Sequence, residues 1–189
     1  MLKGFTNGII DPTSKTVRKA LRNLRDIENA FKEKVYPVPG SVVLCDLVAN
    51  EYHSGIYIGN NRIVHLEGSG EICSVSPERF LKRLGGLTGA NVIFVSCDID
   101  GDPVGDAETA ERALLMVGKS REYNLFFDNC HQFTSGCITG DFDNSDNFTW
   151  MLKMTVEKYM GAEKWLLWKG YDKDISNISD SLRDMLIIR

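Results

Sequence analysis

Two histidines and one cysteine are the residues of this chain best suited to acid–base and nucleophilic chemistry. The segment HSGIYIGNNRIVHL contains His53 and His65, two of only three histidines, on either side of a Gly-Asn-Asn turn. If residues 59–61 form a three-residue loop, Gly55 lies directly opposite His65, and His53 lies diagonal to it on the same face. The imidazoles are then neighbours, and Gly55 leaves room for another group to approach both rings. A two-residue loop would separate the histidines onto opposite faces.

The segment DNCHQFTSGC supplies a thiol that such a pair could serve. Asp128 or Asn129 is a natural N-cap, so Cys130 is expected in the first turn of a helix, where free backbone N–H groups and the helix dipole lower a thiol pKa. The same N–H groups can hold an oxyanion. A thiol nucleophile needs a base, and the base needs an orienting partner; two adjacent histidines provide both. His131 lies roughly 100° further round the helix and is interpreted as a flanking or surface residue.

Metal-binding interpretations fit the sequence less well. A zinc site made of His53, His65 and Cys130 is chemically feasible, but it would consume nucleophile and base together and has no evident fourth ligand. The segment DIDGDPVGD resembles the start of a calcium loop, but its glycine is at the fourth position and Thr109 stands where the bidentate acid is needed. DFDNSDN fails similarly, and both are predicted to be solvated turns. We therefore expect no metal and no other cofactor.

Composition limits the classes of protein and of partner. The 189 residues are 43% hydrophobic and 25% charged, which fits a globular domain, and the net charge of -4 without Lys/Arg clusters argues against a nucleic-acid surface. No apolar run approaches the eighteen or so residues of a membrane span, and the N-terminus lacks a secretory pattern. The five cysteines form an odd set without a C-x-x-C pair, so neither a disulfide framework nor a zinc ribbon is expected. A cytoplasmic location is predicted, and Cys45, Cys73 and Cys97 are interpreted as packed strand residues.

The elements that must position these residues indicate an α+β domain with a central antiparallel sheet and packed helices. Short β-branched and aromatic segments predict a meander of strands from Ser41 to about Val75, and NVIFVSCD predicts another strand. Helices are predicted over residues 12–34, 150–169 and 175–188 and over the segments PERFLKRL, DAETAERALLMVGK and CHQFTSGCIT. In the second of these segments, Asp106 is the expected N-cap and Glu108 and Arg112 form an i,i+4 pair. These elements predict an N-terminal helical segment (1–35), a core (36–140) and a helical C-terminal extension packed on the core (141–189).

The two motifs resemble those of a known family, the lecithin retinol acyltransferase-like proteins, a circularly permuted branch of the papain-like, NlpC-type thiol enzymes. HSGIYIGNNRIVHL is similar to that family's H-x-G-I-Y-x-G-x-x-x-V-x-H hairpin, and NCHQF is similar to its N-C-x-x-F element. VPGSVVLC resembles the strand that precedes the hairpin. The resemblance covers roughly residues 36–140 and implies a permuted papain-like fold, with Cys130 as nucleophile, His53 as base and then acid, and His65 as the residue that orients His53.

The sequence also departs from the family pattern. Glu-His is usual after the motif cysteine, where this chain has His131-Gln132. A tyrosine near the base is usual, so Tyr52 is a candidate oxyanion donor, with Asn129 and Gly55 as further candidates for binding the oxyanion or the substrate. The predicted activity is a cysteine acyl hydrolase or acyltransferase that takes a small-molecule acyl, lipid or peptide substrate.

Other functions remain open. A peptidase or amidase like the cell-wall members of the wider superfamily uses the same residues, and a binding or scaffold protein could keep the fold without chemistry. No transmembrane span is expected. The segment WLLWKGY could contact a membrane surface or a partner, although a Trp-Leu stripe at helical spacing more often belongs to a core.

Overall fold

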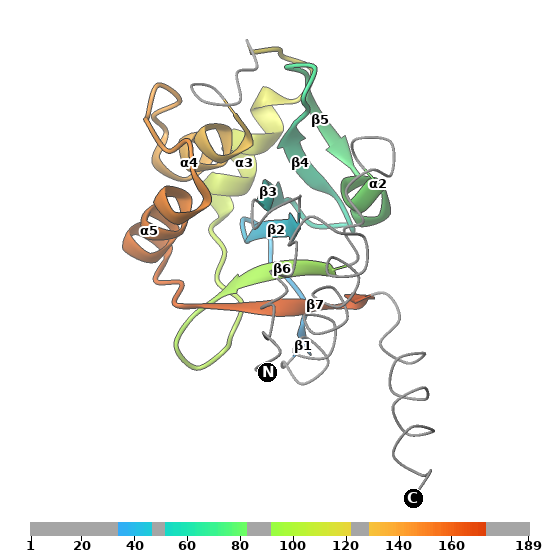
Figure 1. Cartoon of the computed structure of the whole chain (residues 1–189), viewed down its shortest axis with the longest axis vertical. Coiled ribbons are helices and arrows are strands. Elements are labelled where there is room, and N and C mark those ends of the chain that lie inside the picture. Colours follow the sequence, from blue (N-terminus) through green and yellow to red (C-terminus); the bar gives the residue numbers. More distant parts are fainter. Residues whose placement is uncertain (1–33, 47–51, 83–91, 122–128, 173–189) are drawn as a thin grey trace, which may run out of the picture. The chain divides into compact units, whose positions relative to one another are not determined.

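A seven-stranded sheet forms the framework of the described residues in the computed structural model (Figure 1). The structure describes residues 34–46, 52–82, 92–121 and 129–172. Its strands are β1 (Lys34–Val35), β2 (Val42–Asp46), β3 (Tyr52–Tyr57), β4 (Ile63–Leu66), β5 (Ile72–Val75), β6 (Val92–Cys97) and β7 (Lys164–Asp172). Their order across the sheet is β1-β7-β6-β2-β3-β4-β5, and all neighbours except the parallel pair β1 and β7 are antiparallel. The α+β class and the antiparallel meander are therefore confirmed.

Within the described residues, four helices accompany the sheet: α2 (Pro77–Lys82), α3 (Ala107–Met116), α4 (Cys130–Thr139) and α5 (Thr149–Met160). The predicted cap of α3 is confirmed, because the Asp106 side chain accepts hydrogen bonds from the backbone N–H groups of Glu108 and Thr109. The predicted Glu108–Arg112 pair also forms, at 3.1 Å. Helix α4 ends at Gly140, whose φ of 81° is the left-handed conformation that glycine adopts without strain.

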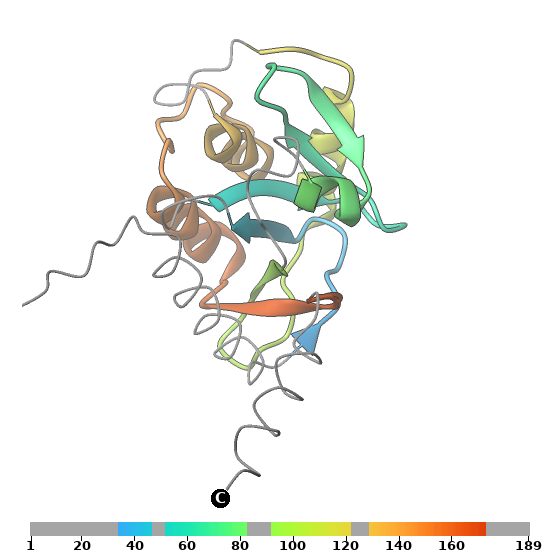
Figure 2. The same cartoon turned by 45° about the vertical axis from the view of Figure 1, so that its right-hand side comes forward.

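The two faces of the sheet pack against different helices. One core combines Val42, Leu44 and Ile56 of the sheet with buried residues of α3, α4 and α5. The other combines Val43 and Cys45 with α2. Alternate residues of each central strand point to opposite faces, which explains why residues 42–45 of β2 are all apolar. Figure 2 shows α4 and α5 on one side of the central strands and α2 on the other.

The helix predicted for the segment WLLWKGY is the main error of the sequence interpretation. The helix predicted over residues 150–169 ends at Met160, and residues 164–172 form strand β7, which pairs with β6 inside the sheet. Leu167 and Trp168 are buried on opposite faces, in the two different cores. A continuous apolar run has no period that separates helix from buried strand, so packing decided its structure.

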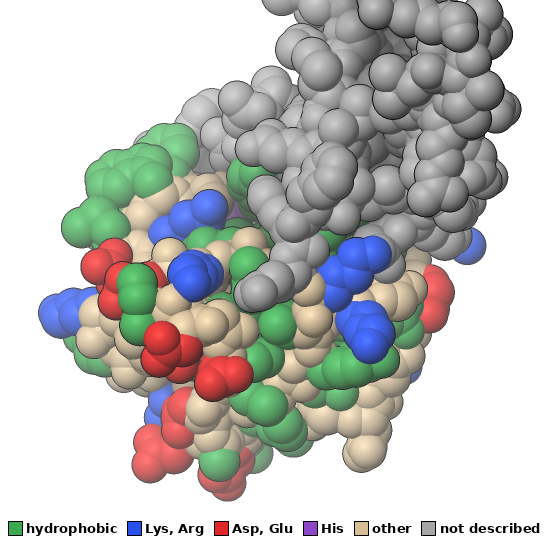
Figure 3. Space-filling model, turned by 90° about the horizontal axis from the view of Figure 1, so that it is seen from below, with side chains coloured by type: hydrophobic (Ala, Val, Ile, Leu, Met, Phe, Trp, Pro, Cys, Tyr) green, Lys and Arg blue, Asp and Glu red, His purple; other side chains and the backbone are tan. Residues whose placement is uncertain are grey.

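The prediction of an N-terminal helical segment over residues 1–35 is wrong at its last two residues, because Lys34 and Val35 form β1 and pair with β7. The rest of that segment and the helix predicted over residues 175–188 lie outside the described residues. Within the described part of the chain, no helix is both long and apolar enough to cross a bilayer. On the face seen in Figure 3, Lys and Arg side chains are interspersed with acidic and apolar ones.

Candidate active site

The β3–β4 hairpin brings His53 and His65 into contact. Ile56 pairs with Val64 and Tyr57 with Ile63, and the Ile58 N–H donates to the Arg62 carbonyl. Residues 59–61 are therefore the odd-length loop that the sequence required, with Asn60 and Asn61 both at positive φ. On this register Gly55 lies opposite His65. The imidazoles are buried, and Nε2 of His53 lies 2.8 Å from Nδ1 of His65.

Gly55 makes this close contact sterically feasible. A β-carbon at this position would lie 2.7 Å from Ile63 Cγ2, 2.9 Å from the Val64 carbonyl oxygen and 3.2 Å from His65 Cβ. The space that the missing side chain leaves is thus taken by β4 itself. Gly55 allows the two strands, and with them the two imidazoles, to approach each other.

Neighbouring residues of β3 serve opposite faces of the sheet. The His53 ring packs on Phe80 of α2, with ring centroids 5.0 Å apart. Ser54 points the other way, toward α4, where its Oγ lies 2.9 Å from Thr134 Oγ1 and 3.0 Å from His131 Nδ1. Helix α4 therefore meets β3 at the residue next to His53.

Cys130 is the first residue of α4, as predicted. Asn129 is the N-cap: its side-chain oxygen accepts hydrogen bonds from the backbone N–H groups of His131, at 2.9 Å, and Gln132, at 3.4 Å. The Asn129 Nδ2 donates to the Asn147 carbonyl oxygen, which joins the start of the helix to the segment before α5. Cys130 is buried. The cap fixes the backbone of the turn that carries the thiol.

His131 is buried, and the sequence interpretation of a flanking or surface residue is wrong in this respect. Its Nδ1 lies 3.0 Å from Ser54 Oγ and its Nε2 lies 3.1 Å from Thr149 Oγ1. The ring therefore connects α4 to β3 on one side and to α5 on the other. This is the structural role that buried histidines with two satisfied nitrogens usually have.

Tyr52 lies on the same face of β3 as Ser54. Its ring packs edge-on against Phe94, with centroids 6.1 Å apart, and the Lys153 Nζ lies 5.4 Å from the ring centroid. The hydroxyl is thus carried on the α4 side of the strand, opposite to the His53 ring.

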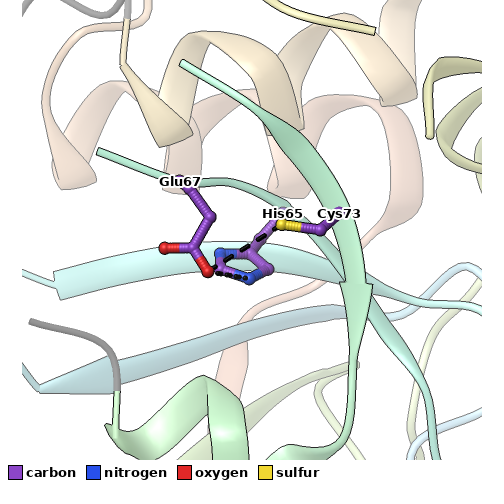
Figure 4. A group of neighbouring side chains, drawn as sticks. All are labelled: His65, Glu67 and Cys73. Atoms are coloured by element: carbon purple, nitrogen blue, oxygen red, sulfur yellow. Dashed lines mark hydrogen bonds and ion pairs between the residues drawn. The ribbon is translucent and has the colours of Figure 1, made fainter. Parts of the chain in front are cut away.

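Glu67 and Cys73 adjoin His65, and the sequence analysis did not assign them to the site. Figure 4 shows both side chains converging on the His65 ring. Glu67 Oε1 lies 3.5 Å from His65 Nε2 and 3.8 Å from Cys73 Sγ. The alternation of side chains along the strands could have predicted both neighbours of His65. Glu67 is two residues beyond His65 and therefore on the same face, and Cys73 is directly opposite His65 in the β4–β5 pairing.

The environments of three other cysteines disfavour their thiolates. Burial raises the pKa of Cys97 to about 11 and raises that of Cys137 further. Burial also raises the pKa of Cys73, and the carboxylates of Glu67 and Glu71 add to the effect. None of the five cysteines forms a disulfide.

The fold and the site define a class of protein: an α+β domain of the papain-like, NlpC type, with a histidine pair on a hairpin and a cysteine at a helix start. The match to a family model makes the assignment specific. The model for lecithin retinol acyltransferase matches residues 39–143, so this chain belongs to the lecithin retinol acyltransferase family. Membership suggests a thiol enzyme of the acyltransferase or hydrolase type.

Relatives among curated proteins are viral polyproteins. The chain is 26% identical over 125 residues to the genome polyprotein of avian encephalomyelitis virus strain L2Z, and 27% identical over 125 residues to that of strain Van Reokel. Each alignment covers 66% of this chain and 6% of the polyprotein, so the chain spans only a small part of these relatives. No solved structure matches the chain.

Proposed function

We propose that this chain is a cysteine-dependent acyl hydrolase or acyltransferase, with Cys130 as nucleophile, His53 as general base and His65 as the residue that orients His53. The 2.8 Å contact between His53 Nε2 and His65 Nδ1, inside the family's hairpin, is the observation that carries the proposal. It engages one nitrogen of His53 and directs Nδ1 to proton exchange with a thiol. Helix α4 supports the proposal because its first turn contacts Ser54, the neighbour of His53.

The reaction proceeds by acyl transfer through the cysteine. His53 Nδ1 takes the proton from Cys130, the thiolate attacks the acyl carbonyl carbon, and the imidazolium returns the proton to the leaving group as the acyl bond breaks. His65 Nδ1 accepts the Nε2–H of that imidazolium. Water, an amine or an alcohol, deprotonated by His53, then attacks the thioester and releases Cys130 as a thiol.

We propose that the oxyanion is held by the backbone N–H of Cys130 and by the Tyr52 hydroxyl. Asn129 contributes by holding the turn, since its side-chain oxygen already accepts from the backbone of His131 and Gln132. Gly55 contributes by allowing the histidines to meet. The substrate is an acyl ester, thioester or amide. A cytoplasmic location agrees with five cysteines that form no disulfide.

The proposal makes a strict demand on geometry. Ser54 rather than His53 faces α4, so the proposal requires the Cys130 sulfur to lie within about 4 Å of His53 Nδ1. A thiol held on the Ser54 face would be separated from His53 by the strand itself.

Thiol reactivity tests this demand. An acyl-like electrophile is applied at neutral pH to the wild type, Cys130→Ala, His53→Ala and, as matched control, Cys45→Ala; labelled positions are found by mass spectrometry. The proposal expects fast labelling at Cys130 that disappears with Cys130→Ala, falls at least tenfold with His53→Ala and persists with Cys45→Ala. Slow labelling spread over all cysteines, or labelling of Cys130 that is independent of His53, would overturn it.

A further inference from the structure

The β4–β5 hairpin carries three side chains that together form a set of metal ligands. The set consists of His65, Glu67 and Cys73, which offer one ligand atom each, and these three atoms lie within 4.8 Å of one another (Figure 4). We propose that His65, Glu67 and Cys73 bind Zn²⁺ or a similar borderline-soft divalent cation, and that the bound cation opposes the reaction proposed for Cys130. The second half rests on the proposed function; the first does not.

Two of the three distances between the ligand atoms suit a tetrahedral ion, and the third, between His65 and Cys73, is within 4.8 Å. Ligands bound to Zn²⁺ at about 2.0–2.3 Å are separated by roughly 3.3–3.8 Å along the edges of the tetrahedron. Glu67 Oε1 lies 3.5 Å from His65 Nε2 and 3.8 Å from Cys73 Sγ. A nitrogen, an oxygen and a sulfur donor are a combination that Zn²⁺ accepts, with water as the fourth ligand.

The backbone holds these ligands in place before any ion arrives. His65 and Cys73 are directly paired across β4 and β5, and the Glu67 N–H donates to the Glu71 carbonyl oxygen at 2.8 Å. The segment after α3 anchors the turn, because the Arg121 N–H donates to the Gly70 carbonyl oxygen. The three donors therefore need little reorganisation to close on a cation.

Charge and access also agree with a cation. The carboxylate of Glu67 and a thiolate at Cys73 neutralise a divalent ion, while His65 contributes a neutral nitrogen. His65 is buried, but the Glu67 side chain is 23% exposed and Cys73 is partly exposed. A cation can thus approach from the side of Glu67 and Cys73.

Metal at His65 Nε2 changes what the other nitrogen can do. The imidazole then keeps its proton on Nδ1, the atom 2.8 Å from His53 Nε2. Nδ1 becomes a donor and cannot accept the Nε2–H of a His53 imidazolium. Proton transfer from Cys130 creates that imidazolium, so the bound cation disfavours the activated thiolate.

Cobalt spectroscopy tests the site without any enzyme assay. Co²⁺ is titrated into the full chain, and the thiolate-to-cobalt charge-transfer band is recorded for the wild type, Cys73→Ser, Glu67→Gln and Glu71→Gln. Glu71→Gln is the matched control, because it removes the same charge from the same turn without removing a ligand of the set. We expect a band in the wild type that Zn²⁺ displaces, its loss in Cys73→Ser, affinity at least tenfold weaker in Glu67→Gln and affinity within about twofold of wild type in Glu71→Gln. No band in the wild type, or an undiminished band in Cys73→Ser, would overturn the site.

Labelling of Cys130 in the same variants tests the regulatory half. Zn²⁺ is expected to slow wild-type labelling at least tenfold, a chelator to restore it, and Cys73→Ser to escape the effect. If Zn²⁺ still slows labelling in Cys73→Ser, the ion acts at Cys130 directly and this half is wrong. If Cys130 is unreactive even without metal, the proposed function fails and the regulatory half with it, while the cobalt titration still decides the site.

Discussion

Replacing Gly55 with alanine tests how closely the two strands must approach for the site to form. The new β-carbon would lie 2.7 Å from Ile63 Cγ2, on a buried β-branched side chain with little rotational freedom, and 2.9 Å from the Val64 carbonyl oxygen, which belongs to the β4 backbone. The backbone of β4 must retreat by roughly half an ångström to restore van der Waals separation. Overpacking of this kind costs about 1–3 kcal/mol, which lowers the Tm by several degrees.

The same displacement lengthens the His53–His65 contact beyond its present 2.8 Å. Misplacement of a catalytic group by 1 Å can cost on the order of 10² in rate. A displacement of about half an ångström should therefore slow labelling of Cys130 by about tenfold. Gly118→Ala is the control: its φ of +83° makes the substitution unfavourable by about 1–2 kcal/mol, but a β-carbon there meets nothing within 4 Å. Thermal unfolding and labelling rate are measured on both variants.

The expected pattern separates local from global damage. Both variants lose stability, but only Gly55→Ala loses Cys130 reactivity below its unfolding range. The reasoning is refuted if Gly55→Ala labels at the wild-type rate, or if Gly118→Ala slows labelling equally.

Three further predictions concern the cap of α4, the cap of α3 and Cys73. Asn129→Ala should cost about 1 kcal/mol in chemical denaturation, because two backbone N–H groups lose their acceptor, and Asn129→Asp should recover most of it; equal losses in both would contradict the capping role. Partial burial raises the pKa of Asp106, but hydrogen bonds from Thr109 and Glu108 and the charge of Arg112 outweigh it and hold that pKa below its ordinary value. The stabilising effect of the Asp106 carboxylate should therefore be complete above the ordinary aspartate pKa and disappear as the pH falls through the lowered pKa of Asp106. The free energy of unfolding of the wild type, measured relative to that of Asp106→Asn, must then decline in acid. A difference between the two proteins that does not change with pH would refute this. Because burial and then Glu67 raise the pKa of Cys73, Glu67→Gln should shift its pH–labelling curve to lower pH, which alkylation at several pH values measures; an unchanged curve would show that the carboxylate has no influence on the thiol.

Local rules predicted the hairpin and the start of α4. A three-residue loop at residues 59–61 was the condition for His53 and His65 to share a face, and the hairpin meets it. The residue types that accept backbone N–H groups predicted a cap at Asp128 or Asn129, and Asn129 is the cap. The hairpin loop and the helix cap each depend on a few residues that are neighbours in the sequence, so both can be predicted without knowledge of the tertiary structure.

Long-range packing determined what the sequence could not predict. Strand β7 reads as a helix because its apolar residues are buried on both faces, and only pairing with β6 makes it a strand. The sequence of α4 alone predicts a flanking or surface position for His131, yet the ring is buried and contacts Ser54 of β3 and Thr149 of α5. Glu67 and Cys73 could have been found by extending the same register reasoning from β4 to the next strand.

Trapping the acyl-enzyme tests the central claim most directly. The chain is incubated with a thioester acyl donor, quenched in acid and analysed by intact and peptide mass spectrometry, alongside His53→Ala. The proposed mechanism predicts one acyl group on Cys130, removable by hydroxylamine and absent in His53→Ala. Acylation at another cysteine, or equal acylation of Cys130 without His53, would contradict it.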